Sequence, residues 1–132
     1  MKQIILLTAI LSLLVSSCTY TSTSTKFPQI DNEESLTASI DSLVPNAGLN
    51  ISGTESNVNG NVTSDAEITL IDAEGLKKGI AGKQKIALNI AKLFYKNITN
   101  KKEYNQFYVT FVFQDGSFTE TQRLVFSSKQ LN

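Results

Sequence analysis

The residue types that could do chemistry in this 132-residue chain are limited. It contains no histidine, no tryptophan and a single cysteine, Cys18. Because histidine is the commonest general base and a common neutral metal ligand, its absence excludes Ser-His-Asp and Cys-His catalysis and histidine-based zinc sites. The remaining possibilities are carboxylate pairs and lysine-assisted hydroxyls, and the sequence offers many of each without a distinguishing spacing. Two carboxylate pairs, Asp65 with Glu67 and Asp72 with Glu74, have members two residues apart that could share one face near a strand end. Such a pair can act as general acid and base.

On an exposed strand end, carboxylates at this spacing are more often solubilising charges. The glycines at positions 75, 79 and 82 match neither G-x-G-x-x-G nor the P-loop pattern, so no phosphate-binding loop is predicted. We therefore expect no catalytic residue and no metal site, and we expect that the protein is not an enzyme.

Basic residues are concentrated in the second half of the chain. Residues 18–75 contain one cation and nine acidic residues, whereas residues 76–132 contain ten cations and three acidic residues. Eight of the cations lie between positions 76 and 102: Lys77, Lys78, Lys83, Lys85, Lys92, Lys96, Lys101 and Lys102. They could form a basic face for anionic headgroups, glycans or an acidic protein. The favoured interpretation is the solvated side of an amphipathic helix, and no motif indicates nucleic-acid binding.

The N-terminus has the pattern of an export signal. Lys2 provides a cationic start, and residues 4–15 are apolar except for Thr8 and Ser12. A helix of about 12 residues spans about 18 Å, which is too short for a hydrocarbon core of about 30 Å. The run ends in small residues before Cys18, as a signal-peptidase site requires.

Val15-Ser16-Ser17-Cys18 resembles the lipobox of bacterial lipoprotein precursors, with valine in place of the commoner leucine. The resemblance covers residues 1–18 only. It implies cleavage between Ser17 and Cys18, a covalent diacylglycerol on the Cys18 sulfur and acylation of the new amino terminus. No cofactor is expected besides this covalent lipid. Thr19 is not the aspartate of enteric-type inner-membrane retention, so the resemblance favours the outer membrane where a cell has one. The alternative is an ordinary secretory signal that leaves a free thiol.

This interpretation divides the chain into a signal peptide (residues 1–17), a lipid-anchored Ser/Thr-rich tether (18–30) and a single domain (31–132). The tether reads Thr-Tyr-Thr-Ser-Thr-Ser-Thr after the cysteine and has no burial pattern, so it is predicted to be flexible. Cleavage leaves 115 residues, enough for one core.

The first half of the domain is predicted to be a short helix and a hairpin. Leu36, Ile40, Leu43 and Val44 share one helical face, Asp31 or Asn32 can cap the helix, and residues 45–48 stop it. Asn59-Gly60 predicts a type I′ turn between strands within residues 49–71. This register pairs Leu49 with Leu70, Ile51 with Ile68 and Gly53 with Ala66 on one apolar face, and leaves a polar tip over residues 54–65.

A long helix and a second hairpin are predicted for the rest. Residues 76–98 have a helical stripe of Ala87, Ile90, Ala91, Phe94 and Ile98, although Gly79 and Gly82 weaken the start. Asp115-Gly116 predicts a turn that pairs Phe113 with Phe118, Phe107 with Leu124 and Tyr108 with Arg123. In this register Glu120 and Gln122 face apolar partners, which indicates a sheet edge or a bulge.

The polar face of the second hairpin is the candidate partner surface. Tyr104, Tyr108 and Arg123 fall on it, and tyrosine and arginine are enriched in binding hot spots. A second layer, such as the first helix, could cover them instead. The phenylalanine stripe on the opposite face is predicted to be core rather than a ligand site.

Together these elements predict an α+β domain with an antiparallel-dominated sheet of about four strands, made of two hairpins, packed against one long helix with a short N-terminal helix. The two middle strands should be parallel if they are neighbours. The expected function is that of a membrane-anchored bacterial envelope lipoprotein, a non-enzymatic binding or accessory module for a protein or glycan partner. The alternatives are an inhibitor or immunity-type protein against an exported enzyme, and a carboxylate-dependent envelope hydrolase.

Overall fold

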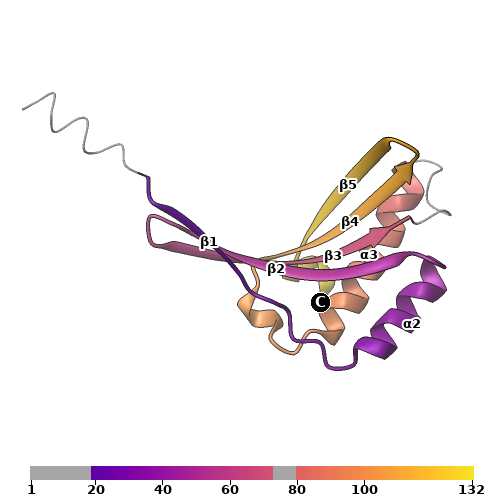
Figure 1. Ribbon diagram of the computed structural model, residues 1–132. Coiled ribbons are helices and arrows are strands. Elements are labelled where there is room, and N and C mark those ends of the chain that lie inside the picture. Colours follow the sequence, from indigo (N-terminus) through magenta and orange to yellow (C-terminus); the bar gives the residue numbers. More distant parts are fainter. Residues whose placement is uncertain (1–18, 73–79) are drawn as a thin grey trace, which may run out of the picture.

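The computed structural model describes residues 19–72 and 80–132. Its centre is one five-stranded sheet whose strands lie in chain order: β1 (Thr21–Thr25), β2 (Gly48–Val58), β3 (Asn61–Ile71), β4 (Gln106–Asp115) and β5 (Phe118–Ser127) (Figure 1). Only β3 and β4 pair in parallel, and the other neighbours are antiparallel. The α+β class and the parallel centre are therefore confirmed.

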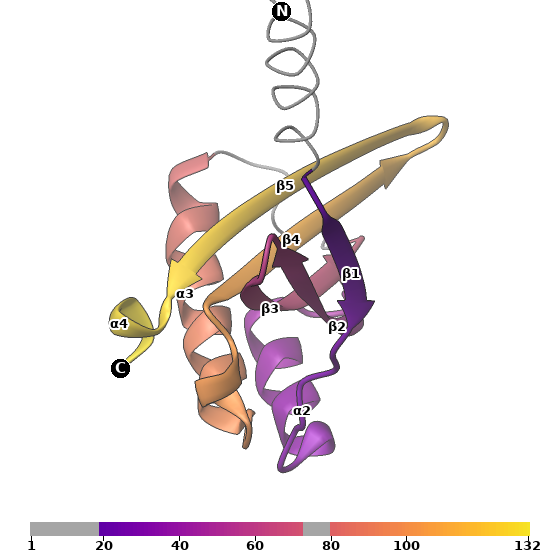
Figure 2. The ribbon, with the colours of Figure 1, turned by 90° about the vertical axis from the view of Figure 1, so that its left-hand side faces the viewer.

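The helices cover one face of this sheet. α2 (Glu33–Leu43) and α3 (Ile80–Asn97) lie side by side against it, and α4 (Ser128–Leu131) lies beside α3 (Figures 1 and 2). A 3-10 turn, η2 (Lys101–Glu103), leads into β4. The sequence predicted a short and a long helix, and the short C-terminal α4 is an addition to them. None of the helices in the described ranges is long and apolar enough to cross a membrane.

The first helix and hairpin follow their sequence signals. Asn32 caps α2 by accepting a hydrogen bond from the Ser35 backbone nitrogen at 2.8 Å. The β2–β3 register pairs Leu49 with Leu70 and Gly53 with Ala66, as predicted. The turn residues Asn59 and Gly60 both have positive φ angles, 52° and 87°, as a type I′ turn requires.

The second hairpin has a register shifted by two residues from the prediction. Asp115 pairs with Phe118, so Gly116 and Ser117 form the turn, and Arg123 lies opposite Thr110 rather than Tyr108. Gly116 has a φ of 59° at the first turn position, where a type II′ turn prefers glycine. A shift of two keeps every side chain on its predicted face. Glu120 and Gln122 lie on β5, which is an edge strand as their polarity indicated.

The core forms between the helices and the covered face of the sheet. The predicted α3 stripe is buried almost completely and packs with apolar side chains from β3, β4 and α2. The largest fully buried side chains of the core include Phe94 of α3 and Phe107 and Phe111 of β4. Most of the phenylalanine stripe is therefore core, as predicted. Phe118 is the exception, since it is 81% exposed at the end of the hairpin.

The predicted flexible tether is wrong for residues 21–25. This segment is β1, which pairs along its whole length with residues 54–58 of β2 and makes the sheet five-stranded instead of about four-stranded. All five of its residues are exposed, so it has no burial pattern to detect. Its threonines have high β-propensity, and the pairing satisfies the backbone groups of the β2 edge.

Candidate functional site

The outer face of the sheet is not covered by any of the described helices, and it contains two of the three predicted surface residues. The guanidinium carbon of Arg123 lies 3.8 Å from the centroid of the Tyr108 ring. One of its nitrogens donates a hydrogen bond to a Glu67 carboxylate oxygen at 2.8 Å. Strands β3, β4 and β5 each provide one of these side chains, so the sheet register holds them together.

The shifted register makes this contact diagonal instead of directly cross-strand. Val125 is the direct partner of Tyr108, and Arg123 reaches the ring from the next pair on the same face, two residues along. Thr110, which lies opposite Arg123, donates its hydroxyl to the other oxygen of Glu67. Arg123 is therefore held by a ring face and a carboxylate while half of its side chain stays exposed, which leaves most of its five donors free for a partner.

This cluster contains one cation and two carboxylates. Glu67 neutralises Arg123, and Asp65 lies two residues away on the same strand face. Burial raises the pKa of the Asp65 carboxyl above its usual range, while the positive charge of Arg123 acts in the opposite direction. A cluster with free donors but no excess positive charge suits a partner that offers hydrogen-bond acceptors rather than a strongly anionic one.

Tyr104, the third predicted surface residue, does not belong to this face. It precedes β4, is only 5% exposed, and packs its ring edge-on near Phe107. Its hydroxyl donates to the Lys26 carbonyl oxygen at 3.1 Å, and burial raises its pKa. The predicted strand began at Tyr104, two residues before β4 actually begins, so alternation along the strand does not apply to this residue. The prediction that Tyr104 belongs to the partner surface is therefore wrong, and its contacts are those of a buried structural residue.

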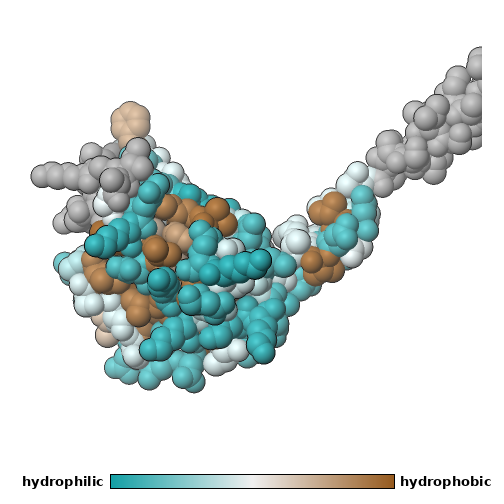
Figure 3. Space-filling view, turned by 180° about the vertical axis from the view of Figure 1, so that it is seen from behind, coloured by the Kyte–Doolittle hydropathy of each residue, from teal (hydrophilic) through white to brown (hydrophobic). Residues whose placement is uncertain are grey.

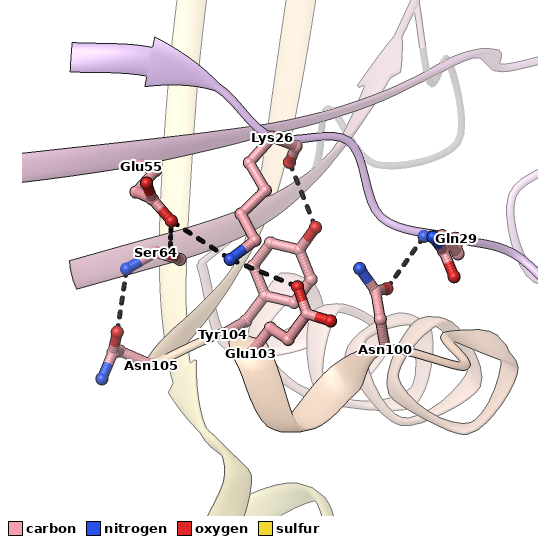
Figure 4. A network of polar contacts seen from close by, with 8 residues as sticks. All are labelled: Lys26, Gln29, Glu55, Ser64, Asn100, Glu103, Tyr104 and Asn105. Carbon is pink, nitrogen blue, oxygen red and sulfur yellow. Dashed lines mark hydrogen bonds and ion pairs between the residues drawn. The ribbon is translucent and has the colours of Figure 1, made fainter. Parts of the chain in front are cut away.

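Tyr104 is part of a clamp that holds residues 26–31 against the domain (Figure 4). The Lys26 ammonium contacts Glu55 at 3.1 Å and Glu103 at 3.2 Å, and Ser64 donates to the same Glu55 oxygen. The hydrogen bond with Lys26 holds the pKa of Glu55 below its usual range, and the two carboxylates raise the pKa of Lys26.

Backbone contacts extend this clamp toward α2. The Gln29 amide donates to the Asn100 side chain at 2.9 Å, and the Gln29 carbonyl accepts from the Thr99 amide at 2.8 Å. Ile30 forms a bridge with Ile98. Residues 26–31 are therefore attached through both main-chain and side-chain contacts.

A glycine makes the clamp possible at its tightest point. The Lys26 amide donates to the Gly53 carbonyl at 2.9 Å, and a Cβ on Gly53 would lie 2.1 Å from the Lys26 carbonyl oxygen. Only glycine allows the backbone of the N-terminal segment to come this close.

Other residues predicted to carry function are placed as follows. Ser17, Cys18, Glu74, Lys77 and Lys78 lie outside the residues that the structure describes. Asp72, with a φ of 56°, accepts a hydrogen bond from the Gln114 amide at 3.2 Å, and its predicted partner Glu74 lies outside the described residues. Within the described ranges, no group of three or more potential ligand side chains could hold a metal ion.

Among the lysines that the structure describes, two are not part of a free basic face. Lys83 is 7% exposed and lies 4.5 Å from the centroid of Phe113, and Lys101 lies 4.9 Å from that of Tyr95. Both contacts use the cation against an aromatic ring. Lys85, Lys92, Lys96 and Lys102 are exposed, which fits the solvated-face interpretation for them.

Comparisons with known proteins identify no relative. No family model, characterised protein or solved structure is significantly similar to the chain.

Sequence reasoning missed Lys26 and Glu55, because their 29-residue separation has no periodic signal. The informative feature was the isolated charge. Lys26 is the only cation among residues 18–75, and Gly53 is a small residue inside an otherwise strand-forming segment.

Proposed function

We propose that the protein is a bacterial envelope lipoprotein, anchored through lipid on Cys18, whose domain acts as a non-enzymatic binding module for a protein or glycan partner. The observation that carries the binding part is the Tyr108–Arg123–Glu67 cluster on the uncovered face of the sheet. An arginine already held between a ring and a carboxylate loses little side-chain freedom when it binds, which lowers the cost of recognition.

The anchor part rests on the lipobox-like segment and on chain geometry. The first described residue, Thr19, directly follows Cys18, and Tyr20 is already bonded to the domain through Asn59. The anchor is therefore coupled closely to the folded part, with almost no free linker. By resemblance, the outer membrane is the proposed location where a cell has one.

The anchor is tested by replacing the proposed acylation site. Cys18→Ser should appear in the soluble fraction or as an uncleaved precursor, whereas the unmodified protein should be processed and pellet with membranes. Normal processing and full membrane retention of Cys18→Ser would refute lipidation at this residue.

The binding face is tested separately on the anchored protein. Native membranes are cross-linked gently, and the proteins and glycans that co-purify with the unmodified chain are compared with those of Arg123→Ala and Tyr108→Ala. Replacing a hot-spot residue by alanine should weaken the binding of a specific partner by about tenfold or more. Thr119→Ala, an exposed change on the same strand, is the matched control. Identical profiles for all four proteins would refute the proposal for this face.

A further inference from the structure

The three strands β1, β2 and β3 continue beyond the helices as an arm, formed by β1 with residues 54–58 and 61–64 (Figure 1). Its end, the arm tip, consists of residues 20–21 and 57–62. Three large side chains are exposed there: Tyr20 at 69%, Val58 at 40% and Val62 at 53%. Figure 3 shows apolar patches on the arm, which stands clear of the body.

The apolar side chains of the tip lie on both faces of the arm. Thr21 pairs with Val58, whereas Asn57, the neighbour of Val58, pairs with Val62. Since successive residues of a strand point to opposite faces, Val58 and Val62 point in opposite directions. A partner docked on one face of the arm would cover only one of them. A medium that surrounds the tip from its end would cover both.

The tip is also free of charge. No charged side chain occurs in residues 19–25 or 56–64. The nearest flanking charge on β2, Glu55, is paired with Lys26. This differs from the rest of the described surface, where charged side chains are common, and it removes the largest cost of entry into a lipid interface.

Several polar backbone groups of the turn at the tip already have partners within the protein. The Asn57 side chain accepts from the Gly60 amide at 2.9 Å, and the Asn59 side chain accepts from the Tyr20 amide at 2.9 Å. The Asn59 amide in turn donates to the Tyr20 carbonyl at 3.0 Å. These internal bonds lower the cost of dehydrating the turn, and tyrosine is a residue type that favours the membrane interface.

We propose that the arm tip is a membrane-contact element that inserts end-on into the headgroup region of the lipid surface carrying the anchor. This inference rests on the proposed acylation of Cys18, which lies two residues before Tyr20 and therefore within about 8 Å of it along the chain. The acyl chains hold the protein to the surface, and the tip sets its orientation. The five β1 pairs then hold the body about 17 Å away from the surface, at about 3.3 Å per residue.

The test uses the full chain after processing to its lipidated form. Acylation blocks the only native cysteine, so Val62→Cys, Val58→Cys and the control Lys92→Cys on α3 each add a unique thiol at an exposed position. Each is labelled with bimane and placed in vesicles of phosphatidylethanolamine and phosphatidylglycerol that contain a lipid with a doxyl quencher near the headgroup. Iodide in the buffer measures exposure to water.

The expected result is several-fold stronger doxyl quenching at positions 58 and 62 than at 92, with weaker iodide quenching at both tip positions. If the lipidated protein sediments with the vesicles and doxyl quenching is equal at all three positions, the tip proposal is wrong and the anchor proposal stands. If the processed protein does not sediment with vesicles, both are wrong. Shielding from iodide in native membranes without doxyl quenching in vesicles would show that a protein covers the tip, which also overturns the proposal.

Discussion

Replacing Gly53 by alanine tests whether the N-terminal clamp contributes to the stability of the domain. The added Cβ would lie 2.1 Å from the Lys26 carbonyl oxygen and 3.1 Å from Pro28 Cδ, whereas real Cβ contacts under 3.0 Å are essentially never seen. The N-terminal segment must therefore move away by about 1 Å or detach from β2.

The expected loss follows from the contacts at this point. The shift weakens the Lys26–Gly53 backbone hydrogen bond and the bond from the Tyr104 hydroxyl to the Lys26 carbonyl. Each is worth about 0.5–1.5 kcal/mol, and overpacking adds about 1–3 kcal/mol. Alanine recovers about 0.4–1 kcal/mol through lower entropy of the unfolded chain. Combined, these ranges give a loss of about 1–5.6 kcal/mol, and we take the middle of this range, about 2–4 kcal/mol, as the expected loss in free energy of unfolding.

Chemical and thermal denaturation of the purified protein, followed by circular dichroism, measure this loss. At about 4 °C per kcal/mol for a domain of this size, Tm should fall by about 8–16 °C. Gly48→Ala is the matched control on the same strand, because its Cβ would make an ordinary 3.5 Å contact with Ile71. Hydrogen exchange of the β1 amides should become faster only in Gly53→Ala. Equal stability and equal β1 protection in the two variants would refute the clamp.

Three further changes test the cap and the two carboxylates whose pKa values shift in opposite directions. Asn32→Ala should lower the free energy of unfolding by about 1 kcal/mol in urea titrations, while the exposed Asp31→Ala should leave it within about 0.5 kcal/mol. Asp65→Asn should raise the free energy of unfolding at pH 7, because the pKa of Asp65 is raised in the folded state and its charged form is therefore costly there. This gain should disappear as the pH falls below about 4, where the carboxyl is protonated in both states. A difference in stability that does not change with pH would contradict this explanation. Glu55→Gln should lower the free energy of unfolding at pH 7, because a carboxylate whose pKa is lowered in the folded state contributes stability above its unfolded pKa of about 4.3. The difference from the unmodified protein should shrink as the pH falls through the folded pKa. Denaturation curves that show the same difference at every pH would argue against the Lys26 contact.

The parts of the fold that the sequence predicts are those set by local signals. Asn59-Gly60 determines a turn, and the turn determines every pair of the first hairpin. The second hairpin offers two overlapping turn signals, Asp115-Gly116 and Gly116-Ser117, and both place the apolar side chains on the same face. The alternation of apolar and polar residues therefore predicts which face each side chain lies on but not the register of the hairpin. The register follows from the turn, in which Gly116 has a positive φ at the first position.

Strand β1 shows where sequence patterns lose their information. Its residues bury nothing, so neither periodicity nor hydropathy marks them, and its pairing depends on the free edge of β2. The candidate site divides in the same way. Tyr108 and Arg123 were predicted on one face because alternation places them there. Glu67 comes from the other hairpin, and its place beside them depends on β3 and β4 being neighbours in a particular register, which the sequence left open.

The direction of β1 determines how the domain bears a mechanical load. β1 runs from the arm tip toward the body, so a pull on residue 19 away from the body acts along the strand, in shear against β2. All five residue pairs and the Lys26 contacts behind them then resist together, instead of opening one after another as they would under a perpendicular pull. Rupture under force is governed by the barrier to unfolding. An anchor attached at residue 19 should therefore resist drag on the domain better than an anchor that pulled the same five pairs apart one at a time.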